Sequence, residues 1–89
     1  MPATPVLRTL NLELRAQLVR RERTQTEVAE LLGIPQSQVS SRLRAQTEWR
    51  LSEFVLLVRT FGLDLDALMS AAAEDAAAQD AEQLAARSA

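Results

Sequence analysis

Cysteine, histidine and lysine are all absent from this sequence of 89 residues. Without cysteine the chain forms no disulfide and offers no thiolate to a metal. Without histidine it lacks the usual general base near neutral pH and the usual zinc ligand. The serines at positions 37, 40 and 41 also have no histidine or lysine to activate them as nucleophiles. We therefore expect a protein that is not an enzyme and that binds no metal or other cofactor.

Long apolar runs are missing as well. The longest, such as residues 54–58, are far too short to cross a bilayer. The N-terminal stretch MPATPVLR lacks the basic start, apolar run and cleavage site of a signal peptide. We expect a cytoplasmic protein, and the length suits one small domain.

The two parts of the chain differ in charge. Residues 1–62 carry nine arginines and six acidic residues, a net charge of +3, whereas residues 63–89 carry one arginine and six acidic residues, a net charge of −5. The overall charge of −2 hides this asymmetry. We divide the chain into a domain of residues 1–70 and an acidic, alanine-rich tail of residues 71–89.

The stretch TQTEVAELLGIPQSQVSSRLR, residues 24–44, predicts a helix, a tight turn and a second helix. Thr24 and Glu27 form a capping-box pattern at the start of the first helix. Val28 then begins an apolar face at helical spacing. Gly33 suits the left-handed residue that ends a helix, and Ile34 is expected to fill the corner of the turn.

The second helix, residues 36–44, has one apolar and one polar side. Pro35 fits its first turn, and Val39 and Leu43 give it an inward side. Its outward side carries Gln36, Ser37, Ser40, Ser41 and Arg44. In a DNA major groove glutamine suits adenine, arginine suits guanine and serine suits either, so we predict that these five side chains contact bases. A helical hairpin without a nucleic-acid role is the alternative.

The stretch resembles the helix-turn-helix of the Cro and lambda-repressor-like (Xre-type) family. The matching residues are Thr24-Gln25, Val28-Ala29, Leu32-Gly33-Ile34 and Gln36-Ser37-x-Val39-Ser40, and the resemblance runs from about Leu14 to Met69. It implies an all-α, five-helix DNA-binding domain whose second helix of the motif contacts bases. It also implies that Gln25 binds a DNA phosphate. Two positions depart from the family pattern: Arg42 stands where an apolar residue is usual, and Ala45 where glycine often follows.

Three further helices are predicted, at residues 5–22, 52–61 and 65–80. The first has a Thr4-Pro5 start and a leucine stripe at positions 7, 10, 14 and 18. The arginines near its end are Arg20, Arg21 and Arg23. They are expected to complement the helix dipole, to contact DNA phosphates, or to do both. We include Arg21 and Arg23 among the candidate phosphate ligands.

The segment between the helix of residues 36–44 and residue 52 is expected to be a loop. Trp49 in this loop either packs at the edge of the core or belongs to a loop on the DNA backbone, in which Gln46, Thr47 or Arg50 contacts phosphate. Ser52 is the expected N-cap of the following helix and Gly62 its end. The apolar residues of that helix, predicted to form the centre of the core, are Phe54, Val55, Leu57, Val58 and Phe61.

The last helix is expected to begin at the cap residue Asp64 and to return Leu65, Leu68 and Met69 to the core. Beyond residue 70 alanine favours a continued helix, although a partly frayed tail is the alternative. If two copies bind DNA as a homodimer, the expected contact surface is Leu68, Ala72, Ala76 and Leu84.

These features favour a sequence-specific DNA-binding transcriptional regulator whose partner is double-stranded DNA. The resemblance implies a small repressor of the phage Cro or immunity type, or a bacterial Xre-type regulator. It also implies that the protein acts in the cytoplasm of a bacterium or of a phage-infected host cell. The alternative is an antitoxin or adaptor whose main role is to bind a protein partner. Partner-binding tails usually carry several large apolar anchors, whereas this tail offers only Leu84.

Overall fold

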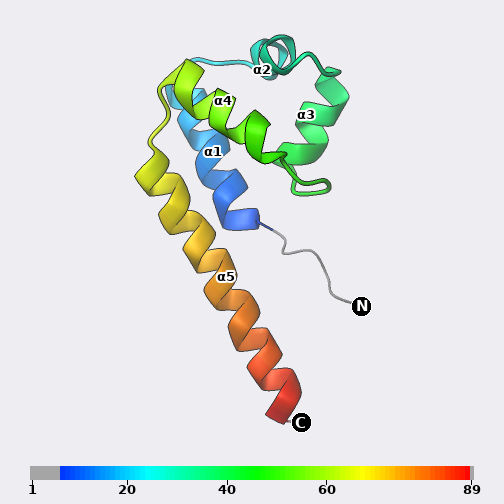
Figure 1. Cartoon of the computed structure of the whole chain (residues 1–89), viewed down its shortest axis with the longest axis vertical. Helices are drawn as coiled ribbons and strands as arrows, with labels where there is room; N and C mark the ends of the chain where they lie inside the picture. Colours follow the sequence, from blue (N-terminus) through cyan, green and yellow to red (C-terminus); the bar gives the residue numbers. More distant parts are fainter. Residues whose placement is uncertain (1–6, 89) are drawn as a thin grey trace.

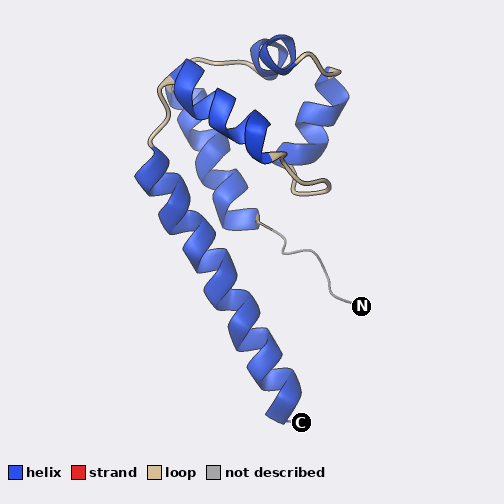
Figure 2. Cartoon of the chain, in the orientation of Figure 1, coloured by secondary structure: helices blue, strands red, loops and turns tan. Residues whose placement is uncertain are grey.

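The computed structural model describes residues 7–88, which form five helices joined by short connections and contain no strand (Figure 2). The all-α, five-helix prediction is confirmed. The helices are α1 (Arg8–Arg20), α2 (Gln25–Leu32), α3 (Gln36–Leu43), α4 (Leu51–Phe61) and α5 (Leu65–Ser88). No helix within this part of the chain is long and apolar enough to span a membrane.

The long helix α5 packs along α1, α3 contacts α1 on its other side, and α2 packs against α3 and α4 (Figure 1). The helix α4 crosses in front of α1 in this view, and α3 stands on the far side of the molecule from α5. The last turns of α5 project beyond the other four helices. The arrangement therefore places α3 and the acidic C-terminal helix on opposite sides.

Every helix contributes one fully buried aliphatic side chain to the core. These side chains, each with no exposed surface, are Leu14, Val28, Val39, Leu57 and Leu68. Leu10 and Leu18 extend the predicted stripe of α1 into the same cluster, and Leu7 packs against it. The burial of a leucine or valine contributes about 1.5–3 kcal/mol, so the five helices are held mainly by this shared cluster.

Four helix ends depend on a residue in the left-handed region. Gly33 and Gly62 end α2 and α4 with φ of 66° and 62°, as predicted. Glu22 and Ala45 adopt φ of 56° and 58° after α1 and α3, although they carry a Cβ atom. After α3, the N–H groups of Ala45 and Gln46 bond back to the carbonyls of Arg42 and Ser41, at 3.0 and 2.9 Å, in a Schellman pattern.

Several predicted boundaries require correction. The helix α1 begins at Arg8 rather than at residue 5 and ends at Arg20, while the Thr4-Pro5 start lies outside the described residues. The helix α4 begins at Leu51, with Arg50 rather than Ser52 as its N-cap, because the carboxylate of Glu53 accepts the backbone N–H of Arg50 at 3.0 Å. The helix α5 continues past residue 80 to Ser88 and crosses residue 70 without a break.

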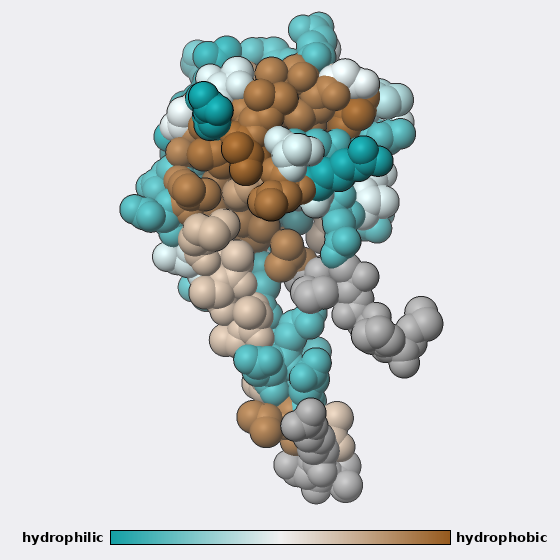
Figure 3. Space-filling view, viewed as in Figure 1, coloured by the Kyte–Doolittle hydropathy of each residue, from teal (hydrophilic) through white to brown (hydrophobic). Residues whose placement is uncertain are grey.

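Part of the predicted core is at the surface. Val55 of α4 and Leu65 and Met69 of α5 are 45%, 47% and 47% exposed, and Phe61 is only half-buried. The predictions for these residues were wrong in this respect because both helices carry more apolar residues than the neighbouring helices cover. Apolar side chains accordingly gather over α4 and the first turns of α5, followed by alanines along α5 (Figure 3).

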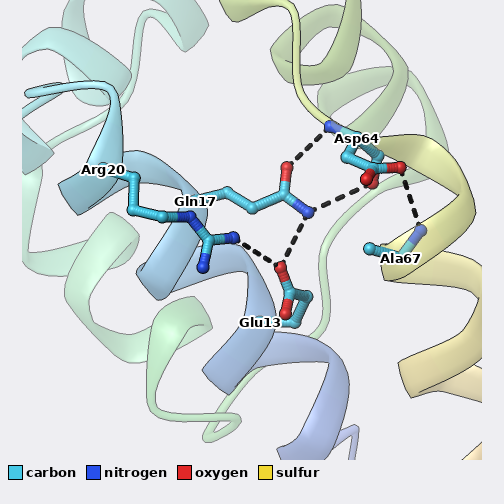
Figure 4. Close-up of polar contacts among 5 residues, drawn as sticks. All are labelled: Glu13, Gln17, Arg20, Asp64 and Ala67. Carbon is cyan, nitrogen blue, oxygen red and sulfur yellow. Dashed lines mark hydrogen bonds and ion pairs between the residues drawn. The ribbon is translucent and has the colours of Figure 1, made fainter.

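A buried glutamine holds the connection between α4 and α5 (Figure 4). Gln17 of α1 is fully buried, and its Oε1 accepts the backbone N–H of Asp64 at 2.7 Å while its Nε2 donates to the carbonyl of Asp64 at 3.1 Å. Nε2 also donates to Glu13, which pairs with Arg20. Asp64 caps α5 as predicted, since its Oδ1 accepts the N–H of Ala67 at 3.1 Å. Gln17 therefore fixes where α5 starts relative to α1.

Asp75 joins α5 to the start of α1. Its two carboxylate oxygens accept the backbone N–H groups of Thr9 and Leu10, each at 3.0 Å. These N–H groups belong to the first turn of α1, whose N-cap residue Leu7 provides no side-chain acceptor. Burial raises the pKa of Asp75, but the hydrogen bonds from Leu10 and Thr9 outweigh it and hold the pKa below its ordinary value of 3.8. Asp75 thus caps α1 from another helix.

This contact predicts a pH-dependent part of the stability. Because the folded-state pKa of Asp75 is depressed, its contribution is present above pH 3.8 and is lost as the pH falls through the folded-state pKa. We expect Asp75→Asn to lower the free energy of unfolding by about 0.5–2 kcal/mol at neutral pH, as other lost caps do. The difference from wild type should shrink as the pH is lowered below 3.8, measured by urea unfolding at each pH. Asp80→Asn, at an exposed position of the same helix, is the control, and a difference independent of pH would contradict the assignment.

Candidate nucleic-acid interface

The helices α2 and α3 pack against each other across a tight turn. Thr24 caps α2 through its Oγ1, which accepts the N–H of Glu27 at 3.1 Å, and the Glu27 carboxylate accepts the N–H of Thr24 at 3.2 Å. This confirms the predicted capping box. Ile34 is half-buried against the core at the corner, as predicted, and Pro35 is the N-cap of α3. The start of α3 is therefore set by local backbone geometry.

The helix α3 has the predicted inward and outward sides. Val39 and Leu43 are buried in the core. Of the predicted base-contacting residues, Gln36, Ser37 and Arg44 are exposed, whereas Ser40 and Ser41 are half-buried. No acidic residue occurs between residues 36 and 47. The outward side is thus polar and carries no negative charge, which suits contact with a polyanion.

The first side chain of α3 is held by α2. Thr26 donates a hydrogen bond from its Oγ1 to the Oε1 of Gln36 at 3.2 Å. An amide oxygen has two lone pairs, so Gln36 keeps one acceptor site and its two N–H donors for a base. Thr26 was not among the predicted site residues, because its contact depends on the angle between the two helices. The same contact places Gln25, the first residue of α2, near the start of α3.

The loop after α3 carries a second group of candidates. Thr47 and Arg50 are exposed, as contacts with a DNA backbone require. Trp49 is half-buried against the core, and its Nε1 donates to the Oδ1 of Asn11 in α1 at 2.8 Å. The core-edge interpretation of Trp49 is confirmed. This contact ties the loop to α1 and leaves Thr47 and Arg50 on its outer side.

The arginines after α1 lie apart from α3. Arg23 is paired with Glu27 at 3.0 Å, and its guanidinium lies 5.2 Å above the ring of Phe61. Phe61 is the last residue of α4, and Figure 1 shows this end of α4 on the opposite side of the molecule from α3. Arg21 is the exposed C-cap of α1. The structure therefore does not bring Arg21 and Arg23 together with the outward side of α3.

A buried arginine, Arg42, lies on the inward side of α3. It was not among the predicted site residues. Arg42 is buried beside Leu43, and its Nε lies 3.2 Å from the Oε1 of Glu53 in α4. One indication in the sequence marked Arg42 as unusual, namely that it stands where the family usually has an apolar residue. Arg42 thus joins the predicted inward residues Val39 and Leu43, since all three side chains are buried.

The arrangement defines a class of protein: an all-α domain in which a second helix follows a first across a left-handed glycine turn and exposes a polar side. A comparison with protein families matches residues 14–68 to Helix-turn-helix, of the Cro/C1 type. The match covers more than half of the 89 residues, and the chain belongs to this family. The family consists of DNA-binding transcriptional regulators. Comparisons with curated proteins and with solved structures gave no significant match.

Proposed function

We propose that this DNA-binding regulator is a transcriptional repressor that recognises its operator by placing α3 in the major groove. The outward side of α3, polar and free of acidic residues, is the observation that supports this most directly. An α-helix with its side chains is about 10–12 Å across and the major groove is about 12 Å wide, so α3 fits. Repression needs only occupancy of a promoter, which excludes the polymerase from the same DNA.

The base contacts are assigned by side-chain chemistry. Gln36 can accept from and donate to adenine, and Arg44 can donate two hydrogen bonds to guanine. Ser37, Ser40 and Ser41 have shorter reach and can bond either donors or acceptors on bases. Gln36 and Arg44 stand at the two ends of α3, so their preferences concern different base pairs of the operator.

The phosphate contacts are proposed for residues at both ends of α3. Gln25 lies at the start of α2 beside the start of α3, and Thr47 and Arg50 lie beyond its other end. These positions suit the two backbones that border a major groove. Arg21 and Arg23 stay proposed phosphate ligands at the margin of the surface, and Arg23 would have to share its guanidinium with Glu27.

The base assignment predicts a change in preference. We expect Gln36→Ala to weaken binding to the selected operator by about 1–3 kcal/mol and to relax preference at one base pair. The operator is first selected from random duplexes, and competition binding against single-base variants then measures the preference. Gln83→Ala, at an exposed position of α5, serves as the control. Unchanged affinity and preference in Gln36→Ala would exclude Gln36 as a base-contacting residue.

The phosphate assignment predicts a change in salt dependence. Arg50→Ala should weaken binding to all sequences alike and reduce the slope of log affinity against log salt by about 1. Arg15→Ala removes the same charge from an exposed position of α1 and should change the slope less. Fluorescence anisotropy at several salt concentrations measures both slopes. Equal slopes for the two variants would show that Arg50 does not contact phosphate.

We further propose that two copies bind one operator. A single recognition helix contacts too few base pairs for a genome-wide search, and a two-fold pair doubles the site. The predicted dimer surface needs correction, because Leu68 is fully buried in the core. Exposed apolar residues remain on α4, at Leu51 and Val55, and on α5, at Leu65 and Met69. Figure 3 shows apolar surface over these two helices. The exposed residues Arg59 and Asp66 belong to the same two helices and would provide opposite charges for a second copy.

If the exposed apolar residues of α4 and α5 form the dimer interface, a substitution there should change assembly without changing the fold. We expect Met69→Glu to keep the fold, since the side chain is 47% exposed, but to abolish the steep two-to-one binding to a palindromic operator. Analytical ultracentrifugation with and without DNA measures the stoichiometry. Val19→Glu, at a 74% exposed position of α1, is the matched control and should behave as wild type. A steep two-to-one isotherm in Met69→Glu would place the interface elsewhere.

A further inference from the structure

The guanidinium of Arg42 is buried between α3, α4 and the loop that follows α3. Its side chain is 11% exposed and that of Glu53 is 12% exposed, with 3.2 Å between Nε and Oε1. The terminal nitrogen NH1 donates to the Oε1 of Gln38, one turn earlier in α3, at 3.4 Å. The Cζ atom lies 5.9 Å above the ring of Trp49. Arg42 therefore contacts two other elements from the inward side of the helix that carries the base-contacting residues.

These contacts continue to α1. The indole of Trp49 donates to Asn11 at 2.8 Å, and the Nδ2 of Asn11 donates to the carbonyl of Leu7 at 2.9 Å. Asn11 is itself buried. We name Arg42, Glu53, Trp49 and Asn11 the Arg42 cluster. Through it, α3 is connected by polar and ring contacts to both α4 and α1.

The ion pair at the centre of the Arg42 cluster is a poor source of stability. Burial of two charges costs several kcal/mol per ion, and the pair recovers this only when geometry and hydrogen bonding are good. The Nε of Arg42 is buried and forms no directed hydrogen bond within the described part of the chain. Apolar residues of similar size often replace such a pair without loss of stability. Stability alone therefore does not account for Arg42 at this position.

The Arg42–Glu53 ion pair restricts the orientation of α3, which apolar packing alone does not. Val39 and Leu43 hold the helix by apolar burial, which is non-directional and allows rotation about the helix axis. A planar guanidinium that must meet a carboxylate and a ring at once restricts that rotation. At a radius of about 5–6 Å, a rotation of about 15° moves a side-chain tip by about 1.5 Å. This exceeds the range of about 0.5 Å within which a hydrogen bond keeps its length.

We propose that Arg42 is a positioning residue that fixes the rotation of α3 about its own axis and thereby decides which outward side chains reach the bases. The inference rests on the proposed function of α3 in base contact. Arg42 itself does not touch DNA, because its guanidinium faces Glu53 and Trp49. Its effect is therefore on base preference and not on non-specific affinity.

The test variant is the double substitution Arg42→Met with Glu53→Gln. Methionine keeps the unbranched stem against Trp49, and glutamine keeps the side-chain oxygen that accepts the N–H of Arg50. The double substitution removes both charges, so neither partner is left as an unpaired buried charge. The control is Arg15→Met with Glu30→Gln, which removes the same two charges from exposed positions of α1 and α2.

We expect the double variant to melt within a few degrees of wild type. Its preference for the selected operator over single-base variants should fall by about tenfold, which is equivalent to one lost base contact. Binding to non-specific duplexes should not change. Arg42→Lys, which keeps the charge without the planar fork, should give an intermediate preference. An unchanged preference in the double variant, or a large loss of stability with preference intact, would overturn the proposal.

Amide hydrogen exchange of the free protein tests the same point without DNA. In the double variant the amides of residues 39–43 should exchange faster than in wild type, whereas those of residues 14–18 in α1 should not change. Equal exchange of α3 in both proteins would also overturn the proposal. A wild-type chain without any base preference would refute the proposed function instead, and the exchange comparison would still decide whether the Arg42 cluster holds α3.

Discussion

The structure depends on the exclusion of water from one cluster to which all five helices contribute. Leu14, Val28, Val39, Leu57 and Leu68 have no exposed surface, and each comes from a different helix. A helix as short as α2 or α3, with eight residues, is marginal in isolation. It persists here because its apolar side is buried against the others. The outward side of α3 therefore need not contribute to helix stability, which leaves it available for the DNA contacts proposed above.

Polar contacts at the edge of this cluster supply what apolar burial cannot, namely direction. Gln17 bonds both backbone groups of Asp64, and Asp75 bonds two N–H groups at the start of α1. Each contact fixes one helix end against another helix. Buried polar groups are costly when unpaired, so such contacts also penalise alternative packings.

The net positive and net negative charges belong to different parts of the molecule. The net charge of +3 lies in residues 1–62 and that of −5 in residues 63–89. Because α5 lies on the opposite side from α3, the acidic residues are held away from the surface that would face DNA phosphates (Figure 1). At physiological salt, interactions between exposed charges fall off over about 8 Å. An overall acidic chain can therefore keep the outward side of α3 free of acidic residues.

Local signals in the sequence were sufficient for much of the fold and part of the candidate site. Thr24 and Glu27, Gly33 and Gly62 act within one turn of chain, and the leucine stripe of α1 needs only helical spacing, so the helices and the sides of α3 could be predicted. Tertiary structure decided which apolar residues are covered, because Leu65 and Leu68 satisfy the same spacing but only Leu68 faces α1 and the core. It also decided that Arg42 meets Glu53 and that Asp75 meets Thr9. Such pairs depend on the angles and separations of packed helices, which no local pattern specifies.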